Sequence, residues 1–361
     1  MAKKKKTTKK NTIKKESPKN KKIEWLEGFK KEQEKKGIKI SFGMESKEKR
    51  YFKFPPFNDF IGGILKGSWV VLWGIEGSGK TTAALDLIAV QLGLAEQLDE
   101  FVVIADVEGT LIGNSEWLEK HGIDIKHPRL IILHGKSMEE ICDALLTMIK
   151  NDIKGIYLID SISAMAPKGE MEDRKGNQRG MENDTVGLRA RQQNKLGRLA
   201  IGSGFALKDI TIVLVGQVYT GISSYGAPLT LSLGMGMKHL SFLRLKFSRG
   251  PRAGWPTRRI DGKDVHYGFT SQIMIEKVKQ DNASPEGSIL QVPFIQNHGF
   301  HYASYLYNKL KIEGRIVSVG KSITFDGETK FNKGKAEMEA WLYDTPEIAE
   351  KELLELLKKE M

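Results

Sequence analysis

The chain has 361 residues, of which 40% are hydrophobic and 28% charged, and its formal net charge is +12. This composition excludes a chain that is disordered throughout, and no apolar run is long enough to span a membrane. The single cysteine, Cys142, excludes an intrachain disulfide framework and suits a reducing compartment, so we expect a packed thiol in a cytoplasmic protein without a membrane partner.

Most of the charge lies in residues 1–22, which hold eleven Lys and one Glu and leave about +2 for the rest of the chain. The segment has few apolar residues to bury, so we expect a disordered basic tail. A polylysine run attracts any polyanion. Two interpretations of the segment stay open: a solubilising or targeting tail, and a tether to DNA.

The next elements alternate regularly. Residues 23–40 predict a short polar helix outside the main core, joined to it by a linker up to residue 54. Short runs rich in Val, Ile and Leu predict strands at 69–74, 100–108, 129–135, 155–161 and 210–217. Helical patterns fall at 82–97, 137–152 and 187–204. Such runs are typical of strands buried on both faces, so the chain predicts an α/β fold with a mostly parallel sheet flanked by helices.

The pattern changes after residue 237. Three further apolar runs follow one another without helices, and they predict hairpin-connected strands that extend the sheet. We expect the core to cover 55–300. Residues 301–361 then form a small α+β domain with a helix, a pair of short strands and a final segment that ends the chain.

The segment GIEGSGKTT, residues 74–82, follows a predicted buried strand and precedes a helix. In this context G-x-x-x-x-G-K-[ST] predicts a phosphate-binding loop, because its N–H groups and the helix start favour an anion. Lys80 would reach the outer phosphates, and Thr81 would hold Mg²⁺. The residues of this ATP-binding loop are Gly74, Gly77, Ser78, Gly79, Lys80, Thr81 and Thr82.

Two carboxylates end other predicted strands. Asp160 ends the strand at 155–161, where it can hold the metal through water. Glu108 ends the strand at 100–108, where it can orient and deprotonate an attacking water. For Glu108 the spacing alone does not distinguish a catalytic carboxylate from an ordinary surface carboxylate.

Seven segments of the chain occur in a characteristic order: GIEGSGKTT, VIADVEGTL, ICDAL, YLIDSISAMAPKGEMEDR, VGLRAR, VLVGQV and GKAEMEAWLYDTPEIAEKELLELL. Through them the chain resembles the RecA DNA recombinases, bacterial or phage, over residues 55–361. The resemblance implies a RecA-like ATPase core with a twisted sheet, and it implies that the helix at 23–40 is an oligomerisation helix that docks on the next subunit. It also implies that Glu108 is the catalytic glutamate and that Gln217 senses the γ-phosphate. Trp117 falls where the family places an aromatic side chain against adenine, although a helix-packing tryptophan is an alternative.

The resemblance also implies two DNA-binding loops, at about 168–187 and 218–236. Val186 and Ile222 match positions where the family uses aliphatic wedges, and plain surface loops are the alternative. Basic residues in and around these loops suit phosphate contacts. The resemblance implies that the basic segment RGPRAGWPTRR at 249–259 lies near a second DNA site that receives the incoming duplex, and a solvated hairpin is the alternative. The basic candidates are Arg174, Lys175, Arg179, Arg191, Arg198, Arg249 and Arg252.

One position departs from the family pattern. The resemblance implies two lysines, two residues apart, that complete the neighbouring subunit's site. Here Lys279 matches the first, but Asp281 stands at the second. Cations supplied in trans stabilise the transferred phosphoryl group, so hydrolysis is expected to be weakened unless Lys277 or another residue substitutes.

Together these residues predict a DNA-dependent ATPase that forms a helical filament on single-stranded DNA and pairs it with a homologous duplex. Single- and double-stranded DNA, further copies of the chain and single-strand-binding or loading proteins are the expected partners, and ATP with Mg²⁺ the expected ligands. The alternatives are a hexameric helicase or translocase of the same fold, and a mediator that binds ATP and DNA without strand exchange.

Overall fold

The computed structural model describes residues 18–36, 38, 40, 46–111, 113–173, 175–179, 187–220, 229–260, 263–332 and 334–358. The chain divides into two compact units, Met1–Lys47 and Glu48–Met361. No helix within these described ranges combines the length and the apolar character that crossing a membrane would need.

The first unit contains helix α1 (Pro18–Lys35), which begins ahead of the predicted residue 23 and ends before residue 40. Proline is well tolerated in a first helical turn, since its missing N–H would have no partner there. Trp25 and Phe29 stack at 5.3 Å on this helix, and Trp25 is 65% exposed. Residues 1–17 of the predicted tail lie outside the described part of the chain.

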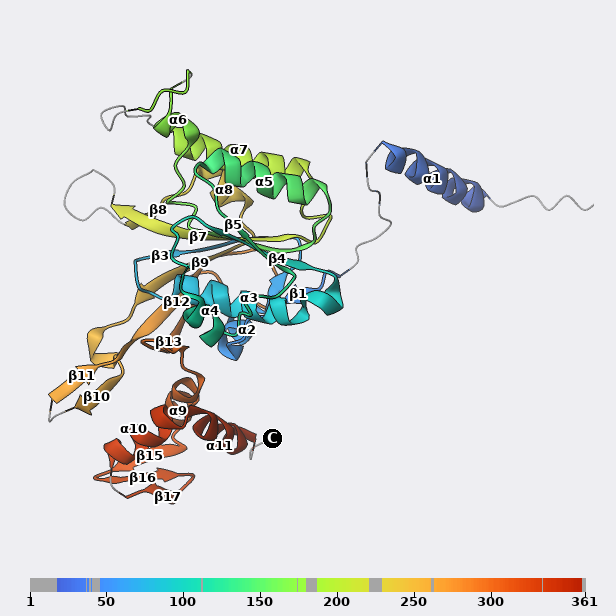
Figure 1. Cartoon of the computed structure of the whole chain (residues 1–361). Helices are drawn as coiled ribbons and strands as arrows, with labels where there is room; N and C mark the ends of the chain where they lie inside the picture. The colour runs from blue at the N-terminus through green and yellow to red at the C-terminus, as the bar shows by residue number, and fades with distance from the viewer. Residues whose placement is uncertain are drawn as a thin grey trace, which may run out of the picture. The chain divides into compact units, whose positions relative to one another are not determined.

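A ten-stranded sheet forms the centre of the second unit (Figure 1). Its parallel part consists, in spatial order, of β9 (Leu243–Arg249), β3 (Trp69–Gly74), β7 (Thr211–Thr220), β6 (Gly155–Asp160), β4 (Phe101–Asp106) and β5 (Leu130–Leu133). Beside β9 the sheet continues antiparallel through β12 (Gly268–Val278), β13 (Ile289–Ile295) and β14 (Gly299–Phe300), and β8 (Leu229–Leu231) pairs with β7. Both the parallel sheet and its antiparallel extension are therefore confirmed.

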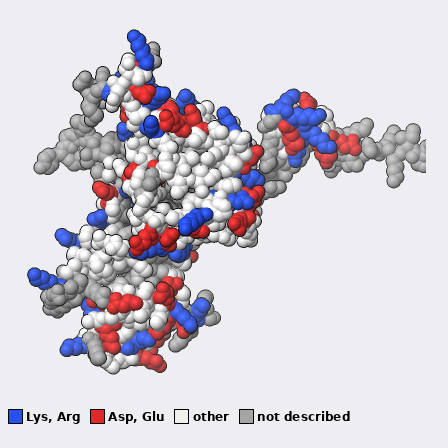
Figure 2. Space-filling model, in the orientation of Figure 1, with Lys and Arg blue, Asp and Glu red and all other residues white. Residues whose placement is uncertain are grey.

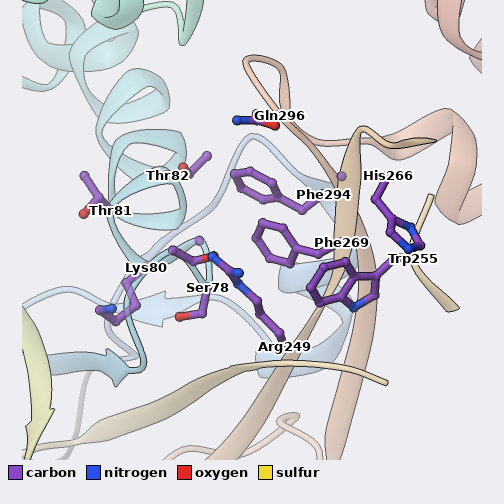
Figure 3. A pocket seen from close by; sticks show the side chains of 13 residues that line it. Ser78, Lys80, Thr81, Thr82, Arg249, Trp255, His266, Phe269, Phe294 and Gln296 are labelled. Atoms are coloured by element: carbon purple, nitrogen blue, oxygen red, sulfur yellow. The ribbon is translucent and has the colours of Figure 1, made fainter. Parts of the chain in front are cut away.

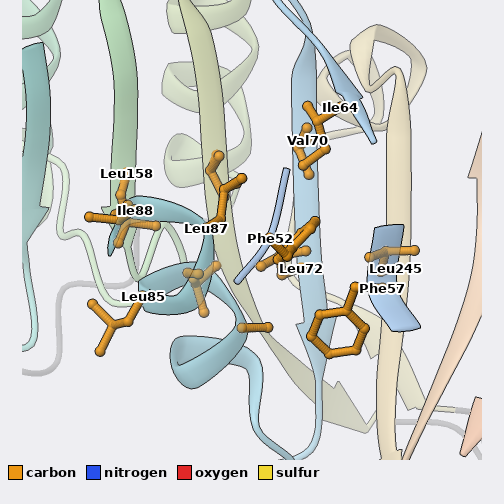
Figure 4. Packing of buried hydrophobic residues seen from close by; sticks show 14 of the residues in the cluster. Phe52, Phe57, Ile64, Val70, Leu72, Leu85, Leu87, Ile88, Leu158 and Leu245 are labelled. Carbon is orange, nitrogen blue, oxygen red and sulfur yellow. The ribbon is translucent and has the colours of Figure 1, made fainter. Parts of the chain in front are cut away.

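Helices cover both faces of the parallel part, as Figure 1 shows. Because strand side chains alternate between faces, Val70 and Leu72 pack under α3 (Lys80–Leu98), whereas Val71 and Trp73 face α5 (Met138–Lys150) and α7 (Leu188–Gly202). Figure 4 shows α3 and β3 meeting the segment around Phe52–Ile64 in the first of these cores. The two cores explain why the strand sequences are apolar throughout.

Smaller elements connect these layers. The hairpin of β10 (Thr257–Ile260) and β11 (Lys263–His266) follows a 3₁₀ turn, η1 (Arg252–Gly254). The others are β1 (Lys49–Arg50), α2 (Pro55–Ile61), β2 (Ile64–Leu65), α4 (Ser115–Lys120), α6 (Lys168–Met171) and α8 (Met235–Leu240).

The C-terminal part has its own apolar core, formed by α9 (Tyr302–Ile312), α10 (Lys335–Asp344), α11 (Pro346–Lys358) and a small sheet. That sheet has three antiparallel strands, β15 (Ile316–Val319), β16 (Ser322–Phe325) and β17 (Glu328–Phe331). The prediction of a pair of strands was therefore wrong. The third strand, ETKF, has a single buried residue, Phe331, and its apolar signal is too weak to be read from the sequence. The domain boundaries at 54 and 300 stay predictions.

Candidate functional site

The carboxyl ends of β3, β7, β6 and β4 lie side by side, so the residues that follow these strands meet at one edge of the sheet. A cavity of about 410 Å³ opens there. Its lining includes Lys80, Thr81, Glu108, Asp160 and Gln217, which come from four separate segments. The parallel topology thus brings together the candidate catalytic residues that the sequence scatters over more than a hundred positions.

The loop between β3 and α3 has the geometry of an anion cradle. At Gly74 a Cβ atom would lie 1.9 Å from the Phe247 carbonyl oxygen, and Gly79 has a φ of 98°, so glycine is required at both. Among the residues that the structure describes, the N–H groups of Gly77, Ser78 and Gly79 donate no hydrogen bond. Three free donors at the start of a 19-residue helix form a ready site for phosphate.

Lys80 and Asp160 flank this loop. Lys80 Nζ donates to the Ile75 carbonyl oxygen at 2.7 Å, and burial lowers the pKa of the ammonium group although three carboxylates attract its charge. Asp160 is 4% exposed and accepts a hydrogen bond from the Thr81 hydroxyl. Burial raises the pKa of its carboxyl group to about 6, against the effect of the Thr81 hydrogen bond.

Residues Thr81 and Asp160 fit a magnesium ion that arrives with a nucleotide. Asp160 Oδ2 is buried without a hydrogen-bond partner among the described residues, while the carboxylate lines the cavity beside the phosphate loop. A hydroxyl and a carboxylate with a free oxygen are the hard donors that Mg²⁺ prefers.

Glu108 is held by two neighbours across the cavity. Gln217 Nε2 donates to Glu108 Oε1 at 2.8 Å, and the Ser161 hydroxyl donates to the same oxygen. Glu108 and Gln217 are both exposed at the open edge, whereas Ser161 is buried. The carboxylate of Glu108 is therefore oriented but accessible to water.

A second cavity, of about 450 Å³, lies on the other side of the phosphate loop (Figure 3). Its wall is aromatic: Phe269 and Phe294 stack at 4.6 Å, and Trp255 packs against Phe269 at 6.3 Å. Arg249 lies over the Phe269 ring at 4.9 Å, and its Nε donates to the Gly77 carbonyl oxygen at 2.9 Å. Such a wall can hold a planar ring next to the phosphates.

Two candidate residues stand apart from both cavities. Trp117 is half-buried, packs against the core under α3 and meets His121 edge-on at 5.0 Å. Lys279 is exposed after β12, with Nζ 3.5 Å from the His239 carbonyl oxygen. Lys277 Nζ donates to that carbonyl at 2.9 Å. Neither Trp117 nor Lys279 reaches its own chain's phosphate loop, so their roles stay predictions.

The DNA-binding candidates fall on several elements. Lys175 and Arg179 belong to the loop after α6, where Glu172 and Gln178 form an isolated bridge. Arg191 and Arg198 are exposed on α7, seven residues apart and hence on one helical face. Arg252 is exposed and lies over the Trp255 ring at 5.7 Å.

The prediction of a loop at 218–236 was wrong for its described ends, because β7 runs to Thr220 and pairs with β8, and α8 begins at Met235. Arg174, Val186 and Ile222 lie outside the described residues.

Several site residues could not be found from the sequence. Ser161, Phe269 and Phe294 read as ordinary strand-end or core residues, and only the sheet order places them here. Arg249 was predicted to contact DNA from a basic segment, but the structure places its side chain on the phosphate loop. Cys142, by contrast, is buried as expected, and burial raises the pKa of its thiol to about 12.

Comparisons with known proteins agree with this geometry. Residues 58–288, well over half of the chain, match the family model of the RecA N-terminal domain. The chain belongs to the RecA family. Protein RecA of Haemophilus ducreyi is 28% identical over 295 residues, which cover 81% of this chain and 72% of that protein. Protein RecA of Mesoplasma florum is 27% identical over 303 residues and 83% of each chain.

Solved structures similar to this RecA-family chain include a KaiC-like protein, PH0186 from Pyrococcus horikoshii OT3, and the RadB recombinase. The first has a TM-score of 0.46 and 16% identity and covers 71% of this chain and 98% of its own. The second has a TM-score of 0.45 and 16% identity and covers 68% and 94%.

Proposed function

We propose that this RecA-family chain is a DNA-dependent ATPase that forms a filament on single-stranded DNA and promotes homologous pairing and strand exchange. The observation that carries the proposal is the direct hydrogen bond between Gln217 and Glu108 at the edge of the phosphate cavity. Gln217 lies on β7, the strand that leads into the second predicted DNA loop. A single contact thus joins the candidate catalytic base to the segment that would hold DNA.

In this proposal ATP is the substrate. Its phosphates take the free N–H groups of the loop and the Lys80 ammonium group, and Glu108 orients and deprotonates the attacking water. Thr81 and, through water, Asp160 would hold Mg²⁺, which would supply charge neutralisation at the phosphates. Gln217 can donate to a phosphate oxygen without adding charge, so an arriving γ-phosphate competes with Glu108 for the amide.

We further propose that the nucleoside occupies the aromatic cavity beside Phe269 and Phe294. The cavity adjoins Thr82 and the helix start, whereas Trp117 lines neither cavity. Phe294→Ala is then expected to weaken nucleotide binding about tenfold, and Trp117→Ala less than twofold. Binding of a fluorescent ATP analogue measures both losses. If Trp117→Ala weakens binding more than Phe294→Ala does, the adenine base lies against Trp117 instead.

The decisive experiment measures ATP hydrolysis with and without single-stranded DNA. We expect DNA to stimulate turnover, Lys80→Ala to abolish it, and Glu108→Gln to lower it by about 100-fold while nucleotide still binds. Turnover that is indifferent to DNA argues against the proposal. Joint-molecule formation between the coated strand and a homologous duplex then tests strand exchange.

A recombination mediator is the second candidate, because Asp281 stands where the family pattern has a lysine and its side chain is exposed. Filaments seen by electron microscopy together with weak hydrolysis and no joint molecules favour the mediator. The variant Asp281→Lys distinguishes a recombinase from a mediator. A gain in ATP turnover means that the site completed by the neighbouring subunit is otherwise intact.

A further inference from the structure

The far side of the phosphate loop is held by β9, which pairs with β3, and by β12, which pairs with β9. Arg249, at the end of β9, donates from Nε to the Gly77 carbonyl oxygen at 2.9 Å. Ser271, its register partner on β12, donates from Oγ to the Ser78 carbonyl oxygen at 2.8 Å. Two successive carbonyl groups of the loop are thus bound by side chains that sequence patterns do not associate with phosphate binding.

These contacts determine where the loop's donors point. In a trans peptide the C=O of one residue and the N–H of the next are antiparallel. When Arg249 binds the carbonyl of Gly77, the N–H of Ser78 therefore points away from Arg249. When Ser271 binds the carbonyl of Ser78, the N–H of Gly79 likewise points away from Ser271. These are two of the N–H groups that lack an acceptor in the described structure.

Arg249 is exposed, and its side chain makes further contacts with aromatic rings. Its guanidinium group lies over Phe269 at 4.9 Å and 6.0 Å from the Trp255 ring, and Figure 3 shows it between Ser78 and Phe269. The fit at Gly77 is close, because a Cβ atom there would lie 2.1 Å from an Arg249 nitrogen. A planar group stacked on an aromatic ring loses little freedom when it bonds, so the arrangement is well suited to hold a loop.

We propose that Arg249 is a positioning residue of the nucleotide site, which preorganises the phosphate-binding N–H groups by holding the carbonyl side of the loop, with Ser271 as its partner. The inference deepens the proposed function and rests on nucleotide binding at this loop. It gives Arg249 a role distinct from direct contact with DNA.

The test is equilibrium binding of a fluorescent ADP and a non-hydrolysable ATP analogue to the full chain, without DNA. Arg249→Gln is expected to weaken both about tenfold, because the charged donor to the loop is lost. Arg249→Lys keeps the charge but loses the Nε donor and the flat stacking surface, so it should restore less than half of the loss on a logarithmic scale.

Arg129→Gln is the matched control. Arg129 also lies over a phenylalanine, Phe101, at 4.8 Å, and also makes a side-chain hydrogen bond, to Asp99 at 2.6 Å, but it is far from the loop in the sheet order. It should bind nucleotide within twofold of the wild type. Thermal unfolding of each variant shows that it is folded.

The outcomes separate the claims. A wild-type chain that binds no nucleotide overturns the nucleotide site and the inference together. A wild-type chain that binds, with Arg249→Gln binding equally well, overturns the role of Arg249 alone. If Arg249→Lys binds nucleotide as tightly as the wild type, the role of Arg249 is purely electrostatic, and the proposed positioning role is overturned. Arg249→Gln should leave oligonucleotide affinity without nucleotide within twofold, and a loss confined to DNA restores the DNA-contact prediction instead.

Discussion

At the scale of single residues, the site keeps charges where burial makes them costly. Asp160 and Lys80 are both at least nine-tenths buried, and burial shifts the pKa of each toward its neutral form. The unbound fold thus holds poorly solvated charges that a bound nucleotide and its metal ion would compensate. Stability and function are opposed at these positions.

This opposition predicts a pH-dependent stability for Asp160. The folded carboxyl group, with a pKa of about 6, holds its proton more tightly than the unfolded one, so the ionised form costs stability above pH 6 and the cost fades toward pH 4. Asp160→Asn should raise the unfolding free energy by about 2 kcal/mol at pH 8 and by much less at pH 4.5. Chemical denaturation at both pH values checks this, and an equal gain at both contradicts it.

The Gln217 amide supports a second residue-scale prediction. Gln217→Ala removes the donor to Glu108 Oε1 but leaves the phosphate loop intact. Nucleotide affinity should change less than threefold, while the stimulation of hydrolysis by single-stranded DNA should fall about tenfold or more. Basal and stimulated turnover, measured side by side, provide the check. Unchanged stimulation means that the DNA signal reaches Glu108 by another route.

At the scale of elements, a buried ion network fixes the amino-terminal end of the sheet. The fully buried guanidinium of Arg50, on β1, bonds to Glu100, to Gln91 on α3, to Thr211 on β7 and to the Gly155 carbonyl oxygen at the start of β6. Glu100 also pairs with Lys66 at 2.9 Å. One side chain thus links several elements at the edge opposite the phosphate loop.

Replacing Arg50 should therefore destabilise the second unit. Arg50→Met leaves Glu100 buried with one cation fewer and several acceptors unpaired, so we expect a loss of about 3 kcal/mol in the unfolding free energy. Lys330→Met, which breaks a surface pair with Glu352 at 2.6 Å, should cost less than about 1 kcal/mol. Similar values for the two variants, by urea denaturation, would show that the network carries no net stability.

At the scale of the whole molecule, charge and apolar surface are unevenly shared between the two units. Both signs are interspersed on the face shown in Figure 2, in keeping with a body near neutrality beyond the basic residues 1–22. The first unit exposes Ile23, Trp25 and Leu26 on α1 by 38–65%. An exposed apolar stripe on a lone helix suits docking on another copy of the chain.

Deletion of residues 1–47 tests this division. The second unit contains all three apolar cores, so it should remain folded and bind nucleotide within twofold of the full chain. Assembly on single-stranded DNA should be lost if α1 docks on the next copy of the chain, as predicted. Analytical ultracentrifugation with nucleotide and oligonucleotide measures this, with Trp25→Ser in the full chain as the milder variant. Assembly that survives both changes places the interface elsewhere.

The sequence by itself predicted the alternating core, the glycine-lysine motif of the phosphate loop and Asp160 at the end of its strand. The predicted strand end at Glu108 was two residues too late, because β4 ends at Asp106. These signals are local: apolar runs of strand length, helical periodicity and a glycine-lysine motif act through the chain's immediate neighbours. It could not show the third strand of the small sheet, where one buried residue carries the signal, nor the early start of α1.

Only the tertiary structure decided which residues meet. Glu108 follows β4, Ser161 follows β6 and Gln217 lies on β7, and the sheet order brings their side chains into hydrogen-bonding distance. Arg249 read as part of a basic segment until the parallel pairing of β9 with β3 placed it on the phosphate loop. Contacts between residues far apart in the chain depend on strand register and order, which no local pattern encodes.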